Sequence, residues 1–418
     1  MTDTVAAPGY VRFAVENRRF LAFGLLMTFG SCFGQTHFIG VFGPSVEAEF
    51  GLSHAEWGTI YMAGTLMSAA LLPFTGRWID RISLRAYAML VCAGLTIACL
   101  VAAAAPAAWF LIVVIFLLRQ TGQGLASHTA ITGMVKYFRH NRGKAIALAL
   151  LGHPIARAIM PLAAVVVIVS IGWRETYLIC ALLALAVMLP LVAWLLAGNI
   201  ETRLFDPETV KPDTGKPPRA EIHKSVSQFL RDPFFWLIIP GVIAPAVIDT
   251  ALFFHQLTIA DMKGWSPTWV TAGYIVFAAV MVVVSIAMGP LVDRLGAIRL
   301  LPLILAPLAL GMLTLAWFDH PAWAWGYLAI SGFASGIRQT VVPAMWAERC
   351  GTRHIGAIKS LATTLSVFGS AFGPPLMGWA MDADIGLDTM IYGTVGYMAV
   401  ATILMMFACR MHKASPAD

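Results

Sequence analysis

LLRQTGQG, residues 117–124, lies inside a long apolar run that covers residues 109–135. Arg119 comes ten residues after Trp109, so a helix that rises 1.5 Å per residue would carry it ~15 Å into the run. The hydrocarbon core of a bilayer is ~30 Å thick, which places this guanidinium near mid-membrane. A charge at that depth is costly, so we expect it to face a polar cavity or a partner.

The same triplet recurs in a second apolar run, residues 324–347. Arg338-Gln339-Thr340 follows Arg119-Gln120-Thr121 by 219 positions and again lies near the middle of its run. Gly76-x-x-x-Asp80-Arg81 likewise returns 213 positions later as Gly289-x-x-x-Asp293-Arg294. Two motifs at nearly one offset predict a duplicated unit, with Arg119 and Arg338 at corresponding positions of its two halves.

The composition is that of a polytopic helical membrane protein. Of 418 residues, 59% are hydrophobic and 12% are charged, about half the charged share of a soluble domain. Apolar runs of 20 or more residues recur along nearly the whole chain. The net charge of +6 lies mostly in short loops, so it reports topology and not a nucleic-acid partner. The six cysteines have no metal-ligand spacing.

The hydropathy pattern predicts an all-α protein of twelve transmembrane helices in two six-helix bundles. A polar segment, residues 198–233, separates bundles 19–197 and 234–410, and short tails cover 1–18 and 411–418. The expected spans are 20–44, 57–76, 85–105, 109–135, 145–170, 174–197, 234–259, 267–289, 299–317, 324–347, 356–380 and 389–409.

Basic residues predict the orientation. With the N-terminus inside, 23 of the 28 lysines and arginines fall in cytoplasmic segments. Arg174 and Lys263 fall outside, and Arg119, Arg157 and Arg338 fall within spans. This bias predicts an integral membrane protein with both termini and the linker in the cytoplasm.

The two Gly-x-x-x-Asp-Arg loops and the six-plus-six layout of residues 20–410 resemble the major facilitator superfamily. The first loop departs from the family pattern at Ser83, where glycine is usual, whereas the second keeps Gly296. Gly122-Gln123-Gly124 through His128, with Arg142-Gly143-Lys144-Ala145, is similar to bacterial members near the organic-anion and monocarboxylate porters.

The resemblance implies two bundles, related by a pseudo-twofold axis along the membrane normal, that rock about a central cavity. Spans 1, 4, 7 and 10 would line most of that cavity, and Arg119 and Arg338 fall in spans 4 and 10. It further implies a charge latch between the bundles, although positive charge at these helix ends also serves as a topology signal. The latch residues would be Gly76, Asp80, Arg81, Arg85, Gly289, Asp293 and Arg294.

Three further ionisable groups are expected at mid-depth. His153 and Arg157 are four residues apart and share a helical face. Asp249 is the one carboxylate placed in the hydrocarbon core. Two interpretations of each group stay open: Arg157 binds substrate or tethers helices, Asp249 takes up a proton or is a fixed counter-ion for Arg338, and His153 titrates or is a hydrogen-bonded core residue.

Three amides complete the candidate substrate site: Gln120, Gln123 and Gln339. They are expected to donate hydrogen bonds to a substrate, and the alternative is that they join neighbouring helices. Three mid-depth arginines against one aspartate leave an excess of positive charge. A bound anion would relieve it, and the planar guanidinium fork suits a carboxylate or a phosphate.

The sequence therefore predicts a monomeric secondary transporter for a small organic anion, driven by protons and surrounded by membrane lipid. The alternatives are efflux of drugs or other apolar solutes and, less favoured, a transporter-like membrane sensor, which would be expected to carry an extra cytoplasmic domain. No phosphate loop, zinc spacing or nucleophile elbow is present. We therefore expect no enzymatic activity, no cofactor, no metal and no nucleic-acid partner.

Overall fold

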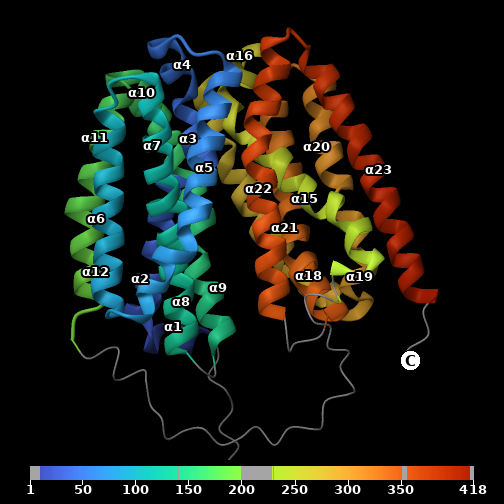
Figure 1. Ribbon diagram of the computed structural model, residues 1–418, viewed down its shortest axis with the longest axis horizontal. Coiled ribbons are helices and arrows are strands. Elements are labelled where there is room, and N and C mark those ends of the chain that lie inside the picture. Colours follow the sequence, from blue (N-terminus) through green and yellow to red (C-terminus); the bar gives the residue numbers. More distant parts are fainter. Residues whose placement is uncertain (1–9, 139–140, 199–227, 229, 351–354, 415–418) are drawn as a thin grey trace, which may run out of the picture. The chain divides into compact units, whose positions relative to one another are not determined.

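The computed structural model describes residues 10–138, 141–198, 228, 230–350 and 355–414, and within them every regular element is a helix (Figure 1). Each of the twelve expected spans falls on helix, which confirms the all-α polytopic prediction. The expected linker, 198–233, falls almost entirely outside the described residues.

The first six spans comprise α1 Tyr10–Glu16, α2 Arg18–Gly30, η1 Ser31–Gly34, α3 Thr36–Ile39, η2 Gly40–Phe42, α4 Gly43–Phe50, α5 His54–Gly76, η3 Arg77–Asp80, α6 Leu84–Ala103, η4 Ala108–Phe110, α7 Leu111–Leu118, η5 Arg119–Ala126, α8 Ser127–Tyr137, α9 Arg142–Leu150, α10 Gly152–Ile171, α11 Trp173–Leu183, η6 Ala184–Met188 and α12 Leu189–Leu195. The last six comprise α15 Pro233–Phe254, α16 Gln256–Met262, α17 Pro267–Ala272, α18 Tyr274–Leu295, α19 Ala297–Leu300, η8 Leu301–Ile304, α20 Ala306–Trp317, α21 Ala322–Cys350, α22 Ile355–Asp382 and α23 Leu387–Ala414.

Eight of the described helical segments are long and apolar enough to cross a membrane, and a ninth does so if Arg18–Gly34 and Thr36–Phe50, bent by 48°, form one span. The remaining three are α5, α21 and α22, with 23, 29 and 28 residues. At 1.5 Å per residue each exceeds ~30 Å, so each is long enough to span despite its polar residues.

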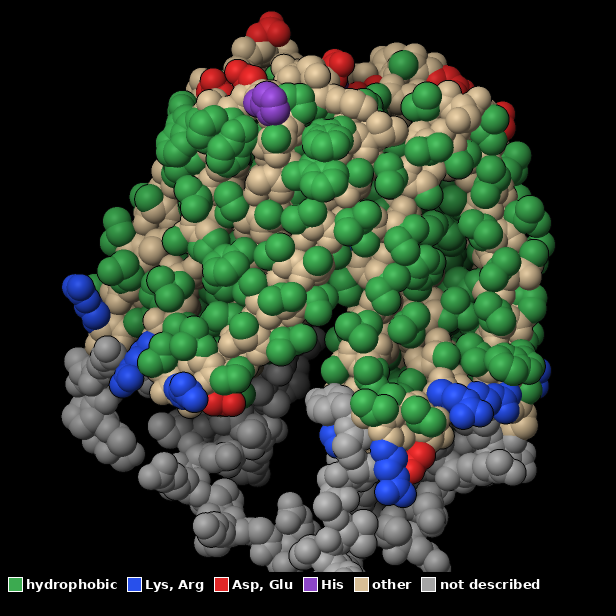
Figure 2. Space-filling model, turned by 180° about the vertical axis from the view of Figure 1, so that it is seen from behind, with side chains coloured by type: hydrophobic (Ala, Val, Ile, Leu, Met, Phe, Trp, Pro, Cys, Tyr) green, Lys and Arg blue, Asp and Glu red, His purple; other side chains and the backbone are tan. Residues whose placement is uncertain are grey.

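The helix surfaces match a lipid environment. Large apolar side chains such as Val169, Ile286 and Ile403 are mostly exposed. Figure 2 shows apolar side chains along the sides of the helices; acidic side chains gather at one end, and lysine and arginine side chains gather at the other, with a few acidic side chains among them. Such a surface is stable against hydrocarbon and would be unfavourable against water. The chain is an integral membrane protein.

Local sequence explains several helix ends. Pro233 occupies the first turn of α15, where its missing N–H costs nothing, and the Asp232 carboxylate accepts a hydrogen bond from Phe234 N at 3.0 Å. α4 ends at Gly51, which adopts a left-handed conformation with φ 62°. These signals fix helix boundaries independently of the apolar pattern.

The described residues form two compact units that do not follow the two expected halves. The first unit contains the described residues within Met1–Gln35, Met67–Ala156 and Ile171–Asp213. The second unit contains the described residues within Thr36–Leu66, Arg157–Ser170 and Thr214–Asp418. The second unit thus contains parts of spans 1, 2 and 5. The bundles 19–197 and 234–410 stay a prediction.

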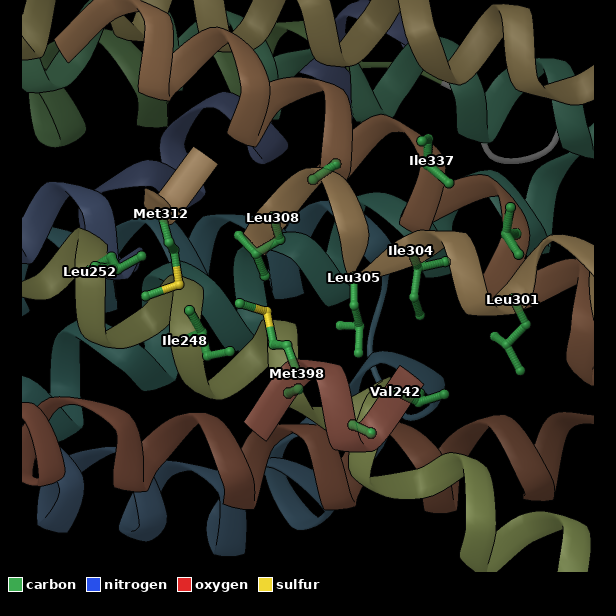
Figure 3. Close-up of a cluster of buried hydrophobic side chains, with 14 of the residues drawn as sticks. Val242, Ile248, Leu252, Leu301, Ile304, Leu305, Leu308, Met312, Ile337 and Met398 are labelled. Carbon is green, nitrogen blue, oxygen red and sulfur yellow. The ribbon is translucent and has the colours of Figure 1, made fainter. Parts of the chain in front are cut away.

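Side chains of α15, α18, α20, α21 and α23 form the core of the second unit. Figure 3 shows Ile248, Leu252, Leu308, Met312 and Met398 among these buried residues. Two glycines bring the first-half segment close to this core: a Cβ on Gly40 would lie 2.4 Å from Phe253 O, and one on Gly58 would lie 2.7 Å from Pro375 N. Segment 36–66 is therefore packed backbone to backbone against α15 and α22.

Candidate functional site

The stretch that carries Arg119 departs from regular α-helix. Residues Arg119–Ala126 form a π-helical segment between α7 and α8, a geometry that often occurs at functional sites. The Arg119 side chain is 4% exposed, and its Nη1 donates a hydrogen bond to Gly34 O at 3.3 Å. The guanidinium is therefore buried in the first unit and tied to the end of η1.

A close backbone approach surrounds this contact. A Cβ on Gly34 would lie 2.1 Å from Leu118 O and 2.6 Å from Gln123 N, and a Cβ on Gly122 would lie 2.6 Å from Gly34 N. No larger residue fits at Gly34 unless one backbone segment moves. The chain also bends immediately after it, at Gln35, which is extended with ψ 145°. The two glycines therefore set the position of Arg119 against span 1.

The two amides of the π-helical segment differ. Gln120 Nε2 donates to Thr75 Oγ1 at 2.7 Å, and Gln120 Oε1 accepts from Ser68 Oγ at 3.0 Å. This pair of bonds favours the helix-joining interpretation of Gln120. Gln123 is half-buried, and within the described part of the chain its side chain makes no hydrogen bond. Gln123 therefore keeps its role as a candidate substrate donor.

His153 lies near the start of α10 and contacts span 1. Its Nδ1 is 3.2 Å from Ser31 Oγ, and the Ser31 hydroxyl donates to Thr28 O at 2.7 Å. The hydroxyl has one proton, which this second bond uses, so His153 Nδ1 is the donor to Ser31. In this arrangement the imidazole is hydrogen-bonded within the first unit.

Arg157, in the second unit, joins helices of both sequence halves. Its Nη2 donates to His37 Nδ1 at 3.2 Å, and its guanidinium lies 5.1 Å from the ring centroid of Phe253 and 4.7 Å from that of Phe277. His37 is 4% exposed, and its carbonyl accepts a hydrogen bond from Gln256 Nε2 at 2.7 Å. These contacts favour the tether interpretation of Arg157. They also place His37, which the sequence did not single out, at the centre of this polar contact.

Arg338 and Asp249 form an ion pair in the second unit. Arg338 Nη1 lies 2.7 Å from Asp249 Oδ2, and the two side chains are 30% and 15% exposed. Gln339, the next residue, turns to the exposed side of α21 and donates to Ser285 Oγ on α18. Asp249 is thus the counter-ion of Arg338 in this structure, and Gln339 joins two helices.

A polar cluster in the second unit that no sequence pattern indicated consists of Glu47, His54, His255 and Asp382. Asp382, which lies beyond the expected span 356–380, accepts hydrogen bonds from His54 N at 3.1 Å and Ala55 N at 2.9 Å. His54 Nδ1 lies 3.1 Å from Glu47 Oε2, and His255 Nε2 lies 2.9 Å from Pro374 O. These residues are far apart in sequence, so no local spacing could have revealed them.

The charge state of Asp382 depends on these contacts. Burial raises the pKa of its carboxyl, but hydrogen bonds from the Ser53 side chain and from the N–H groups of Ala55 and His54, together with the nearby His54 ring, outweigh burial and lower the pKa. Asp382 is therefore ionised at neutral pH, as an acceptor at the start of α5 requires.

Comparison with known proteins decides the family. The sequence profile of the Major Facilitator Superfamily matches residues 24–374. The chain belongs to this superfamily. Its members are transporters that work by alternating access, so this protein is a membrane transporter and not an enzyme. No curated protein matches the sequence significantly.

Two solved structures share the superfamily fold with this chain. Both are of a bacterial homolog to the human lysosomal transporter Spinster, one inward-facing and occupied, the other inward-facing and unoccupied. The first is 17% identical with a TM-score of 0.71, and the second is 16% identical with a TM-score of 0.70. Each alignment covers 99% of this chain and 100% of the other. At this identity the likeness concerns the fold alone.

The superfamily loop appears in two different local conformations. Gly296, in the second copy, has φ 83°, and the Glu348 carboxylate on α21 accepts from Ala297 N at 2.6 Å. Ser83, in the first copy, has φ −61° and caps α6 by accepting from Ala86 N at 3.2 Å. The departure at Ser83 is thus compatible with the loop because the backbone there no longer needs a glycine.

The remaining latch residues lie at or near helix ends. Asp80 Oδ1 is 4.0 Å from Lys136 Nζ, and both side chains are partly or largely exposed, so this pair contributes little stability. Gly76 ends α5, and Gly289, Asp293 and Arg294 lie on the last turns of α18. Arg81 follows η3, and Arg85 lies in the first turn of α6. A charge latch between the two halves stays a prediction.

Proposed function

We propose that this transporter moves a small organic anion, in particular a carboxylate, and that protons drive it. The observation that carries the proposal is the buried Arg119 guanidinium on a π-helical segment in the middle of a span. Ionisable residues at this depth are rare and mark substrate or ion pathways. The fork of donors on an arginine fits a carboxylate in a bidentate manner.

Arg338 is the second binding residue in this proposal. Its position in the sequence repeat corresponds to that of Arg119, so it is the candidate anion-binding residue of the second half. Gln123 adds an amide donor one helical turn beyond Arg119. Gln120, Gln339, His153 and Arg157 support the site by joining helices, as their hydrogen bonds indicate.

The same residues support a coupling mechanism. Asp249 Oδ2 lies 2.7 Å from Arg338 Nη1, so the Asp249 carboxylate competes with a substrate anion for this guanidinium. A proton on Asp249 would remove this competition and leave the guanidinium for the substrate carboxylate, so proton and anion would bind together.

Asp249→Asn tests the coupling. Asparagine is isosteric but cannot accept a proton at neutral pH, so we expect uptake of the bound carboxylate into proteoliposomes to lose its dependence on pH and on a proton gradient. Exchange of labelled for unlabelled carboxylate, which needs no net proton movement, should persist. A variant that still accumulates substrate against its gradient, with the wild-type pH profile, would contradict the proton role.

The binding function itself is tested without any assumption on coupling. We expect at least one member of a panel of mono- and dicarboxylates to raise the unfolding temperature of the purified protein in a saturable manner. The matched control for each acid is its neutral amide, which has nearly the same shape and no charge. An anion site would be refuted if each acid and its amide stabilised the protein equally, or if none of the acids stabilised it.

One observation favours a second candidate function, export of apolar solutes. The second unit contains a cavity of about 560 Å³ lined mainly by apolar residues of α15, α22 and α23, among them Ile248, Leu376 and Met390. A cavity of this size and composition suits an uncharged organic molecule. Stabilisation by apolar compounds, and by no carboxylate in the panel, would favour this function.

The charge distribution supports an orientation for transport. We place both termini and the basic loops on the cytoplasmic side of a bacterial inner membrane, because loops rich in lysine and arginine stay inside. The acidic ends of the helices, including the cluster around Asp382, then face outward.

A further inference from the structure

Among the described residues, three side chains could hold a metal ion together: Glu47, His54 and His255. Each offers one ligand atom, and the three atoms lie within 4.8 Å of one another. Glu47 is on α4, His54 begins α5, and His255 lies between α15 and α16. All three belong to the second compact unit, but two come from the first sequence half and one from the second.

The imidazole of His255 is oriented for metal binding. His255 is 1% exposed, and its Nε2 lies 2.9 Å from Pro374 O. A carbonyl oxygen can only accept, so Nε2 carries the proton and the lone pair lies on Nδ1. Metal-binding histidines usually donate their other ring N–H to a backbone carbonyl in this way, which fixes the tautomer and the ring orientation.

The distances fit a tetrahedral ion. Bonds of 2.0–2.1 Å to nitrogen and oxygen place two tetrahedral ligands about 3.3 Å apart. Glu47 Oε2 and His54 Nδ1 are already 3.1 Å apart, and the proton that Nδ1 donates to the carboxylate in this hydrogen bond would be released when the metal binds. No separation in the cluster exceeds 4.8 Å, so the ligand atoms need to approach by at most about 1.5 Å, which side-chain rotation can supply.

Helix α22 fixes the positions of two of the three ligands. Asp382 accepts hydrogen bonds from the backbone N–H groups of His54 and Ala55, and Pro374 of the same helix, α22, accepts the bond from His255. A Cβ on Gly378 would lie 2.4 Å from His54 O, so α22 touches the start of α5 directly. One helix thus positions both imidazoles.

We propose that Glu47, His54 and His255 bind a divalent transition-metal ion of the Zn²⁺ class, with water as the fourth ligand. Two imidazoles and one carboxylate suit Zn²⁺, whereas Mg²⁺ and Ca²⁺ prefer oxygen ligands alone. The ion connects α4 and the start of α5 to the end of α15, and so holds these segments of the two sequence halves together. The fold assembles this site from distant residues, which is why the sequence shows no zinc spacing.

The test uses the purified full-length protein after treatment with a chelator, and it needs no substrate. Titration with ZnCl₂, followed by isothermal calorimetry and thermal unfolding, should show one bound ion and a higher unfolding temperature, and MgCl₂ should have no effect. Glu47→Gln, His54→Gln and His255→Gln should each weaken Zn²⁺ binding at least tenfold. Glutamine at 255 keeps an N–H for Pro374 O, so the fold should persist.

His320→Gln is the matched control, because His320 is exposed and lies outside the cluster. It should leave Zn²⁺ binding unchanged. If His255→Gln fails to fold, His54→Gln decides, since the His54 side chain is one third exposed and its bond to Asp382 uses only the backbone. The proposed site would be wrong if all three ligand variants bound Zn²⁺ as tightly as the wild type, or if MgCl₂ raised the unfolding temperature as ZnCl₂ does.

The connecting role has a separate readout. Zn²⁺ should slow hydrogen exchange in segments 43–58 and 250–262 of the wild-type protein and not in His54→Gln. Exchange that Zn²⁺ leaves unchanged in these segments, despite binding, would show that the ion does not hold them together.

Discussion

We expect Gly34→Ala to lower the stability of the protein so far that most of the purified chain is no longer folded. The new Cβ would lie 2.1 Å from Leu118 O and 2.6 Å from Gln123 N, and both are backbone atoms that no side-chain rotation can move. Overpacking a well-filled interior costs about 1–3 kcal/mol, and we expect at least the upper end because two helices must separate. The separation would also remove the hydrogen bond from Arg119 Nη1 to Gly34 O.

Thermal unfolding of the purified protein and its yield of monodisperse material in detergent measure this effect. Gly143→Ala is the matched control, because Gly143 is exposed on α9 and a Cβ there meets nothing within 4 Å. Alanine is the better helix former, so this variant should be unchanged or up to about 1 kcal/mol more stable. If Gly34→Ala and Gly143→Ala both had the unfolding temperature and yield of the wild type, the tight approach of η1 and η5 would not exist in solution.

This contact illustrates what hydropathy could and could not predict. Twelve spans followed from apolar runs, because a membrane requires each span to be long and hydrophobic. The interruptions did not follow, because the bend at Gln35, the π-helical segment from Arg119 and the break at Leu151 all lie inside runs that are long and apolar enough to predict one continuous span. At Gln35 and Arg119 the interruption accompanies a contact between Gly34 and Gly122, which are distant in sequence.

The site residues show the same limit. Depth and charge alone identified Arg119, Arg338 and Asp249 as exceptional, and the structure pairs the last two. Depth could not decide which polar residues join helices, because that depends on the neighbour, as for Gln120 between Ser68 and Thr75. Nor could it find His37, which is buried beside Arg157.

Arg119→Lys and Arg338→Lys are expected to abolish most of the substrate-dependent stabilisation while the protein still folds. Lysine keeps the positive charge, so Asp249 retains a partner in the second variant. It loses the planar fork, and with it one of the two parallel hydrogen bonds to a carboxylate. A charge-assisted contact contributes about 1.5–3 kcal/mol, so each variant should bind the carboxylate at least about tenfold more weakly.

Arg174→Lys separates this effect from a general loss of stability. Arg174 donates to Ala103 O and Ala105 O at 2.7 Å each and lies over the Trp173 ring, so it too uses its fork, but only for the fold. Its lysine variant should unfold at a lower temperature and yet show the full shift with the carboxylate. Arg119→Lys and Arg338→Lys should show the reverse pattern, because their guanidinium groups serve the ligand more than the scaffold. If either variant bound the carboxylate as the wild type does, that arginine would be a structural residue and not part of an anion site.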